Sequence, residues 1–330
     1  MAWRSPFTLV SKLNCKNSHG LRDAQISSTS RTISGKSLCF WIEATTPWAS
    51  LMNLSILMIQ FTLPIRFRTP TLTWLKIFMR LTWTLWWRSK NKPFLLSRYV
   101  FRKPLCKTLA GVTCEYLTIT SKDRKDNIAK RQCVIISSRV HPGETVGSWM
   151  MRGVIKFITD PYHKEAILLR ENFIFKVIPM LNPDGVINGN YRCSLAGCDL
   201  NRRWKAPSKI IHPTVYHTKQ LVKESHDERG VFLFCDLHGH SRKHNIFMYG
   251  CHNPKVPEET RIFPYLLSKI SKYFSFDSSR FGVQKSKEST ARIALYKDLQ
   301  NVPNIFTMES TFSGMDFVTF IIFLIVVKGT

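Results

Sequence analysis

The ten residues from Ile135 to Glu144 constrain the fold more strongly than any other stretch of this chain. An apolar run breaks at a Pro-Gly turn, which has His141 before it and Glu144 after it. Apolar residues then recur at helical spacing as far as Ile158, which is the pattern of an amphipathic helix. The stretch therefore predicts a strand, a tight turn and a helix, with an imidazole and a carboxylate at the carboxyl end of the strand.

Strand and helix signals alternate through the chain from about Leu105 onward. Strands are predicted at 114–120, 132–138, 173–178, 231–236, 246–249, 281–284 and 305–308. Helices are predicted after Glu144 as far as about Thr159 and at 164–170, 214–225, 259–272 and 290–299, and a long polar loop covers 182–207. Such alternation favours an α/β fold, with a mixed, largely parallel twisted sheet and helices on both of its faces.

Three ionisable residues, His141, His238 and Glu309, each stand just after a predicted strand. Sites in open α/β sheets gather at the carboxyl ends of the strands, so we expect these three to meet. Together with Glu144, the two histidines form a ligand set that suits a catalytic zinc ion with one position left for water. His240 is an alternative ligand if the strand continues, and Glu309 is suited to act as the general base.

The charge balance favours anionic partners. The 330 residues include 48 basic and 22 acidic side chains, a net charge of +26, and such a field attracts acidic protein tails, acidic lipid or nucleic acid. The sequence has no zinc-finger spacing or other nucleic-acid motif, and its apolar stretches at 51–65 and 317–327 are interrupted or shorter than the about 20 residues of a spanning helix. We therefore expect acidic protein tails as partners, and neither nucleic acid nor a membrane.

Cysteine usage indicates a reducing compartment. The nine cysteines include no C-x-x-C pair, and several lie in apolar runs, as buried thiols do. The N-terminus has no continuous apolar segment of signal-peptide length. We therefore expect a cytoplasmic protein.

The first third of the chain differs from the rest. Residues 1–98 hold seven of the nine tryptophans and only two acidic residues, Asp23 and Glu43, and neither strand nor helix periodicity persists there. We interpret 1–98 as an atypical basic segment that is disordered or derives from a misjoined gene model; an aromatic, basic binding surface is the alternative. Residues 99–316 form the predicted catalytic domain, and 317–330 a short apolar tail.

Several motifs occur together in a fixed order. They are His-Pro-Gly-Glu at 141–144, Met-Leu-Asn-Pro-Asp-Gly-Val-Ile-Asn-Gly-Asn-Tyr-Arg-Cys-Ser-Leu-Ala-Gly at 180–197, Asp-Leu-Asn-Arg at 199–202, Asp-Leu-His-Gly-His-Ser-Arg-Lys at 236–243 and Phe-Thr-Met-Glu-Ser-Thr-Phe at 306–312. In these motifs the chain resembles the cytosolic carboxypeptidases, the tubulin-deglutamylating branch of the zinc metallocarboxypeptidases, and within them the cytosolic carboxypeptidase 2/3 group. The resemblance runs from about Pro104 to Gly314.

The resemblance implies a fold, a cofactor and a reaction. It implies a zinc carboxypeptidase-like fold that binds one zinc ion per chain and removes C-terminal or side-chain glutamates from proteins such as polyglutamylated tubulin, at the cytoskeleton or cilium. The implied roles are zinc binding by His141, Glu144 and His238, general base catalysis by Glu309, oxyanion stabilisation by Arg192, binding of the substrate's terminal carboxylate by Asn201 and Arg202, and binding of its acidic side chain by Arg292.

Two departures from the family bear on these expectations. The family carries a β-sandwich domain ahead of the catalytic domain, and 1–98 does not resemble it. The chain also ends soon after Glu309, where the family continues into a further helix, so we expect a catalytic domain that is truncated at its C-terminus. The first alternative to an enzyme is therefore a catalytically silent fragment that binds acidic tails. A basic nucleic-acid-binding protein is the second.

Overall fold

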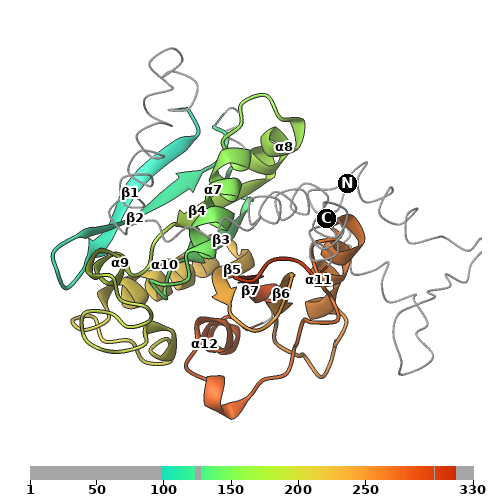
Figure 1. The fold of residues 1–330 in the computed structure, drawn as a ribbon. Coiled ribbons are helices and arrows are strands. Elements are labelled where there is room, and N and C mark those ends of the chain that lie inside the picture. The colour runs from blue at the N-terminus through green and yellow to red at the C-terminus, as the bar shows by residue number, and fades with distance from the viewer. Residues whose placement is uncertain (1–97, 123–127, 301, 317–330) are drawn as a thin grey trace, which may run out of the picture.

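The structure, a computed structural model, describes residues 98–122, 128–300 and 302–316. The predictions for 1–98, Arg98 apart, and for the tail 317–330 lie outside the described residues. Within those ranges the chain forms one α/β unit around a single sheet (Figure 1).

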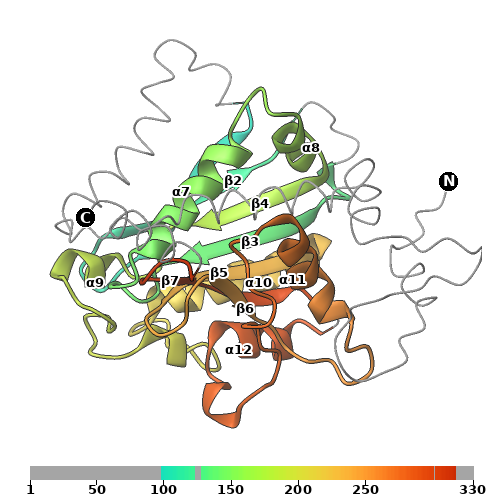
Figure 2. The ribbon, with the colours of Figure 1, turned by 45° about the vertical axis from the view of Figure 1, so that its right-hand side comes forward.

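Seven strands form the sheet in the order β1-β2-β4-β3-β5-β7-β6. They are β1 (Val100–Lys107), β2 (Thr113–Ile119), β3 (Gln132–Ser138), β4 (Phe173–Ile178), β5 (Val231–His240), β6 (Ile246–Tyr249) and β7 (Ile305–Thr311). The central strands β4, β3, β5 and β7 run parallel, whereas β1, β2 and β6 make antiparallel pairs (Figure 2). The expected mixed sheet is confirmed, and its parallel part is the centre.

The sequences of the central strands explain why they pair in parallel. Every residue of β3 after Gln132 is buried, and β4 is buried at all positions except Lys176. Strands that are apolar at successive positions must be covered on both faces, which a parallel sheet between helices provides. This arrangement brings the carboxyl ends of β3, β5 and β7 to one edge of the sheet.

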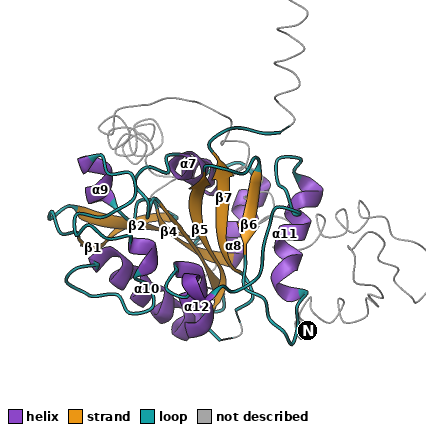
Figure 3. Cartoon of the chain, turned by 60° about the horizontal axis from the view of Figure 1, so that its bottom comes forward, coloured by secondary structure: helices purple, strands orange, loops and turns teal. Residues whose placement is uncertain are grey.

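Helices cover both faces, as the sequence predicts. They are α7 (Val146–Ile158), α8 (Lys164–Asn172), α9 (Pro183–Asn188), α10 (Pro213–Arg229), α11 (Glu259–Ile270) and α12 (Ala291–Asp298). Val134 and Ile136 of β3 join a hydrophobic cluster with α7, α8 and α11, whereas Cys133 and Ile135 join a second cluster with α10 and α12. Figure 3 shows α7 on the opposite side of the sheet from α10 and α12. None of the described helices has the length and apolar character to span a membrane.

The predicted polar loop at 182–207 contains two short helices that the sequence analysis missed. Pro183 is at the start of α9, where the Asn182 side chain accepts a hydrogen bond from the Gly185 amide, and Gly189 ends the helix with a φ of 79°. Asn before Pro at the start and Gly at the end are ordinary helix limits. A single 3-10 turn, Leu200–Arg202, follows.

One strand was not predicted from the sequence, and one predicted strand does not form. Strand β1 was not predicted, because its charged residues and Pro104 obscure the alternation; β1 is an edge strand, where proline is tolerated. Conversely, 281–284 does not form a strand, and only an isolated bridge joins Tyr249 to nearby Arg280. Phe281 is nevertheless buried in the first hydrophobic cluster, so its apolar character serves packing rather than pairing.

Strands β5 and β7 are longer than predicted. They pair with each other from Phe234 and Ile305 through to His240 and Thr311, because each continues to supply hydrogen-bond partners to the other beyond its apolar run. His238 and Glu309 therefore lie within strands, and not just after them as the sequence analysis expected.

Candidate metal centre

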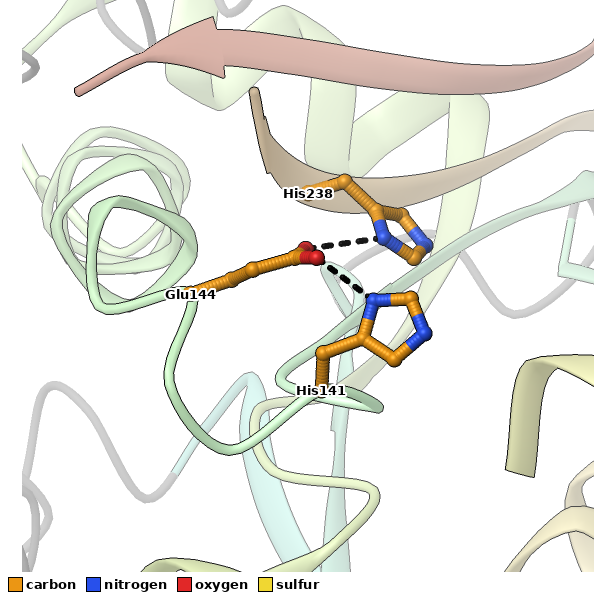
Figure 4. Close-up of side chains that lie close together, drawn as sticks. All are labelled: His141, Glu144 and His238. Carbon is orange, nitrogen blue, oxygen red and sulfur yellow. Dashed lines mark hydrogen bonds and ion pairs between the residues drawn. The ribbon is translucent and has the colours of Figure 1, made fainter. Parts of the chain in front are cut away.

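His141, Glu144 and His238 converge at the carboxyl edge of the sheet. One ligand atom from each residue lies within 4.8 Å of the other two. In Figure 4 both imidazoles direct Nδ1 toward the carboxylate, with His141 Nδ1 2.6 Å from Oε1 and His238 Nδ1 2.9 Å from Oε2 of Glu144. The rings meet edge to face with centroids 5.0 Å apart. The structure thus brings together the three residues that the sequence assigns to a metal ion.

The Pro-Gly turn after β3 places His141 and Glu144 on the same side. The Glu144 amide donates to the His141 carbonyl at 3.2 Å, and the Gly143 amide donates to the Tyr191 carbonyl at 2.7 Å. A β-carbon on Gly143 would lie 2.5 Å from the Tyr191 ring, so a larger residue would force the turn away from that loop. A third amide, from Gly239 of β5, donates to Glu144 Oε2 at 2.9 Å, which ties the turn to the strand that carries His238.

Each histidine also has a carboxylate on its other ring nitrogen. His141 Nε2 is 3.1 Å from Asp199 Oδ1, and His238 Nε2 is 2.6 Å from Asp236 Oδ2. Asp236 is fully buried, and its second oxygen accepts a hydrogen bond of 2.7 Å from the Ser137 hydroxyl. These partners fix the orientation of both rings.

This arrangement fits one zinc ion. A carboxylate at Nε2 favours the tautomer with its proton on that atom, which leaves the Nδ1 lone pair available to a metal. Two imidazole nitrogens and one carboxylate are the protein ligands of many catalytic zinc sites. The buried carboxylates of Glu144 and Asp236 add negative charge that a dication would compensate.

The charges of Glu144 and His238 shift each other's pKa values. Burial alone would raise the pKa of Glu144, but His238 and His141 hold it well below its usual range. Burial would lower the pKa of His238, but Asp236 and Glu144 raise it well above the ordinary value. Without a metal, the neighbouring carboxylates thus favour the protonated form of His238 and the histidines favour the ionised form of Glu144.

Glu309 lies next to this cluster, in β7, at the position paired with His238. Among the described residues, its carboxylate has no hydrogen-bond or ion-pair partner. Burial is the main cause that raises its pKa to about 7, with Glu144 adding to the rise and His238 opposing it. A carboxyl group with this pKa can take up and release a proton near neutral pH.

His240 does not join the centre. Its Nδ1 accepts hydrogen bonds from the Arg242 and Lys243 amides at 3.1 and 3.0 Å, and its ring packs edge to face on Phe247. The strand does continue through Gly239, but the His240 ring accepts hydrogen bonds from the turn that follows. The alternative of His240 as the third ligand is therefore wrong in this structure.

Three of the predicted site residues, Arg192, Asn201 and Arg202, lie around Asp199, and the Asn201 amide donates to Asp199 Oδ1 at 2.8 Å. Arg192 pairs with Asp199 Oδ2 through Nε at 2.8 Å and through Nη2 at 2.7 Å, and Arg202 lies 4.0 Å from the same oxygen. Asn201 is buried and its Oδ1 accepts a hydrogen bond from the Ala291 amide at 2.9 Å. Asp199 therefore contacts a metal ligand with one oxygen and arginines with the other.

Arg292 carries a buried positive charge. It is 7 % exposed, donates to the Gly250 carbonyl and to Cys251 Sγ, and lies 5.9 Å from the centroid of the Tyr249 ring. It has no ion-pair partner within the part of the chain that the structure describes. A buried unpaired guanidinium is costly, so this position is suited to receive an anion.

Sequence reasoning missed two residues of the centre, Asp199 and Asp236. Asp236 stands two residues before His238 in one strand, so the two side chains share a face, and this spacing could have identified it. Asp199 begins the 199–202 motif but contacts His141 only through the fold, so the sequence carried no equivalent signal.

Comparison with known proteins agrees with this geometry. The sequence profile of the zinc carboxypeptidases, described as "Zinc carboxypeptidase", matches residues 96–298. The chain is 50 % identical over 232 residues to cytosolic carboxypeptidase 2 of Xenopus tropicalis, covering 69 % of this chain and 24 % of that protein. It is 47 % identical over 229 residues to cytosolic carboxypeptidase 3 of Bos taurus, covering 68 % and 22 %. The chain thus spans about a quarter of the length of these curated relatives.

A solved structure shares the fold. The crystal structure of a metallo-carboxypeptidase from Burkholderia cenocepacia superposes with a TM-score of 0.57 at 22 % sequence identity, over 68 % of this chain and 59 % of that one. The architecture expected from the sequence, a zinc carboxypeptidase-like sheet, is therefore confirmed.

Proposed function

Because the chain belongs to the zinc carboxypeptidase family, we propose that it is a zinc-dependent metallocarboxypeptidase that removes glutamates from the C-termini or side chains of proteins such as tubulin. The cytosolic carboxypeptidases that it matches support a cytoplasmic location, and we extend the proposal to the cytoskeleton or cilium. One observation carries the proposal: His141, Glu144 and His238 converge beside the carboxylate of Glu309.

Each group of the site has its own role in the proposed peptide hydrolysis. A zinc ion held by the three ligands would polarise the scissile carbonyl and acidify a water molecule. Glu309 accepts the proton of that water and returns it to the leaving amine, a role that its position beside His238 supports. Arg192, which is 43 % exposed beside Asp199, supplies positive charge for the oxyanion.

The cations around the centre favour an acidic substrate. In this proposal Asn201 and Arg202 hold the terminal carboxylate, and Arg292 meets the side chain of the residue removed; the burial of Arg292 without an ion pair in the described residues supports the last role. The pKa of Lys287 is lowered by burial and then by the neighbouring arginines, Arg202 first among them. Several cations thus lie close together with Asp199 as their acidic neighbour, and a glutamate would relieve their mutual repulsion.

The partner that follows from this chemistry is an acidic protein tail, with polyglutamylated tubulin as the specific case. The net charge of +26 would speed encounter with such a tail, and salt would screen that attraction. A glutamate-rich tail also supplies the two carboxylates, terminal and side-chain, that the separate arginines require.

The test is release of free glutamate by the purified chain in the presence of zinc. A peptide that ends in several glutamates is compared with the same peptide ending in glutamines, and the assay is repeated after chelation and after zinc is restored. We expect zinc-dependent release from the glutamate peptide only. Binding of the glutamate peptide without release, in protein shown to hold zinc, would contradict the enzyme and support a fragment that only binds acidic tails.

A further inference from the structure

Arg139 has a backbone conformation that is unusual for its residue type. It directly follows β3, two residues before His141, and its φ is 58°. This is the left-handed region, which a residue with a β-carbon rarely adopts. Among the described residues other than glycine, only Asn245, with a φ of 64°, shares it. Such strain persists only where surrounding contacts hold it, and it occurs preferentially at functional sites.

The side chain of Arg139 joins two parts of the metal-binding segment. It is 2 % exposed, and its Nη2 donates to the Pro142 carbonyl at 2.5 Å while its Nη1 donates to the Ser148 hydroxyl at 2.6 Å. Pro142 directly follows His141, and Ser148 lies in the first turn of α7. The planar guanidinium therefore connects the turn that carries both ligands to the helix that follows them.

The rest of the turn is held by the protein around it. The Ser138 carbonyl accepts from the Leu181 amide at 2.9 Å, and the Val140 carbonyl accepts from the Asn182 side chain at 3.3 Å. These contacts fix the chain before His141. Arg139 acts between His141 and Glu144, where the separation of the two ligands is set.

The burial of this cation is not explained by packing alone. The guanidinium of arginine stays charged at neutral pH, and at 2 % exposure this charge lies in the interior. Its Nε is buried and has no hydrogen-bond partner among the described residues, which is unfavourable. A strained backbone and a buried charge are both maintained at one residue whose described contacts are with the metal-binding segment.

We propose that Arg139 is a positioning residue for the metal centre, whose left-handed backbone directs the guanidinium under the turn so that it holds His141 and Glu144 at the separation a metal ion requires. The inference rests on the proposed metal centre. The fork of the guanidinium matters as well as its charge, because a lysine ammonium offers a single point of contact and cannot span both acceptors in a fixed geometry.

The test compares zinc affinity with stability in matched variants. Arg139→Gly removes the guanidinium but relieves the backbone, and Asn245→Gly relieves the same conformation away from the centre. Zinc affinity is measured by chelator competition, ligand geometry by the absorption spectrum of the cobalt-substituted protein, and stability by denaturant unfolding of the metal-free protein. We expect zinc binding about 10- to 100-fold weaker and an altered cobalt spectrum in Arg139→Gly, with unchanged zinc binding in Asn245→Gly. Arg139→Lys should remain as weak as Arg139→Gly.

Ser148→Ala carries the test if Arg139→Gly does not fold. It removes one anchor of the guanidinium and leaves the backbone of residue 139 as it is, so zinc affinity should fall by a few-fold, about 3- to 10-fold. Zinc affinity within about twofold of wild type in Arg139→Gly and Ser148→Ala would overturn the inference while leaving the metal centre intact. Recovery of wild-type affinity by Arg139→Lys would also overturn it. A wild-type chain that binds no zinc would instead overturn the metal centre itself.

Discussion

His238 and Glu309 occupy paired positions in the parallel register of β5 and β7. The proposed metal ligand and the proposed proton acceptor therefore come from adjacent strands, whose backbone hydrogen bonds fix their spacing. Glu309 has no polar partner of its own in the described residues, and its ionisation responds to the charges of the metal centre. Reactivity at Glu309 and occupancy of the metal centre are thus physically linked.

Replacing Glu309 by glutamine should separate metal binding from catalysis. Glutamine keeps the shape of the side chain but cannot accept a proton, so we expect glutamate release to fall by about 10²- to 10⁴-fold. Zinc content, measured by elemental analysis, should stay at the wild-type value because Glu309 is not among the ligands. Unchanged activity in this variant would remove Glu309 from the mechanism.

The same substitution should change how stability depends on pH in the metal-free protein. The pKa of Glu309 is about 7 in the folded state against 4.5 for the free side chain, so the folded state binds its proton more tightly. Its contribution to stability is therefore lost as pH rises from 4.5 to 7. We expect Glu309→Gln to gain about 3 kcal/mol of unfolding free energy relative to wild type between acidic and mildly alkaline pH. A constant difference across that range, in denaturant titrations, would contradict the raised pKa.

Replacing Asp236 by asparagine should weaken zinc binding. The carboxylate holds His238 Nε2 at 2.6 Å, and loss of such a partner typically costs about 10- to 100-fold in metal affinity. Ser137→Ala removes only the hydrogen bond to the other oxygen of Asp236 and serves as the matched control with a smaller loss. Chelator competition measures both, and equal zinc affinity in Asp236→Asn and wild type would show that the carboxylate does not act on the ligand.

Zinc uptake should release protons at neutral pH. Asp236 and Glu144 raise the pKa of His238 well above its ordinary value, so the metal-free centre holds a proton that must leave before Nδ1 can bind zinc. Zinc affinity should therefore increase as pH rises. Calorimetric titrations in two buffers of different ionisation enthalpy should report release of about one proton per zinc. Identical heats in both buffers would mean that His238 is already neutral.

Arg292 should determine the preference for an acidic residue. Its buried guanidinium has no carboxylate partner within the described ranges, and a charge-assisted hydrogen bond is worth about 1.5–3 kcal/mol. Arg292→Gln should therefore lower kcat/KM for a glutamate-terminated peptide by about 10- to 100-fold, as this energy implies. The exposed Arg203 provides the control, since Arg203→Gln should leave the preference unchanged. An equal loss for both variants would indicate a general effect of charge.

The sequence predicts the centre of this fold well because the centre is locally encoded. The apolar run of β3 and the turn at 141–144 carry their own periodicity and turn signals, and their predicted limits match the structure. The edge strand β1 is not encoded locally in this way. The side chains of β1 are half-exposed or exposed throughout, so its strand conformation comes from pairing with β2 and leaves little trace in its own sequence.

Some features of the candidate site can likewise be predicted from the sequence, and others depend on the fold. His141 and His238 follow apolar runs and could be located from the sequence. The choice between His238 and His240 depends instead on the contacts that the His240 ring makes in the folded protein. The left-handed conformation of Arg139 has no sequence signal, because arginine does not favour it. Its place is set by contacts with Pro142 and Ser148, which exist only once the turn and α7 have formed.

The separation of the ligands along the chain has a consequence for how the protein acquires its metal. Glu144 and His238 are 94 residues apart, and closing so long a loop costs entropy that a local turn cannot recover. The ligands meet only when β3 and β5 have paired, which makes the site a late product of folding. Bound zinc would therefore act as a reporter of complete assembly of the central strands, visible in refolding experiments before any substrate is added.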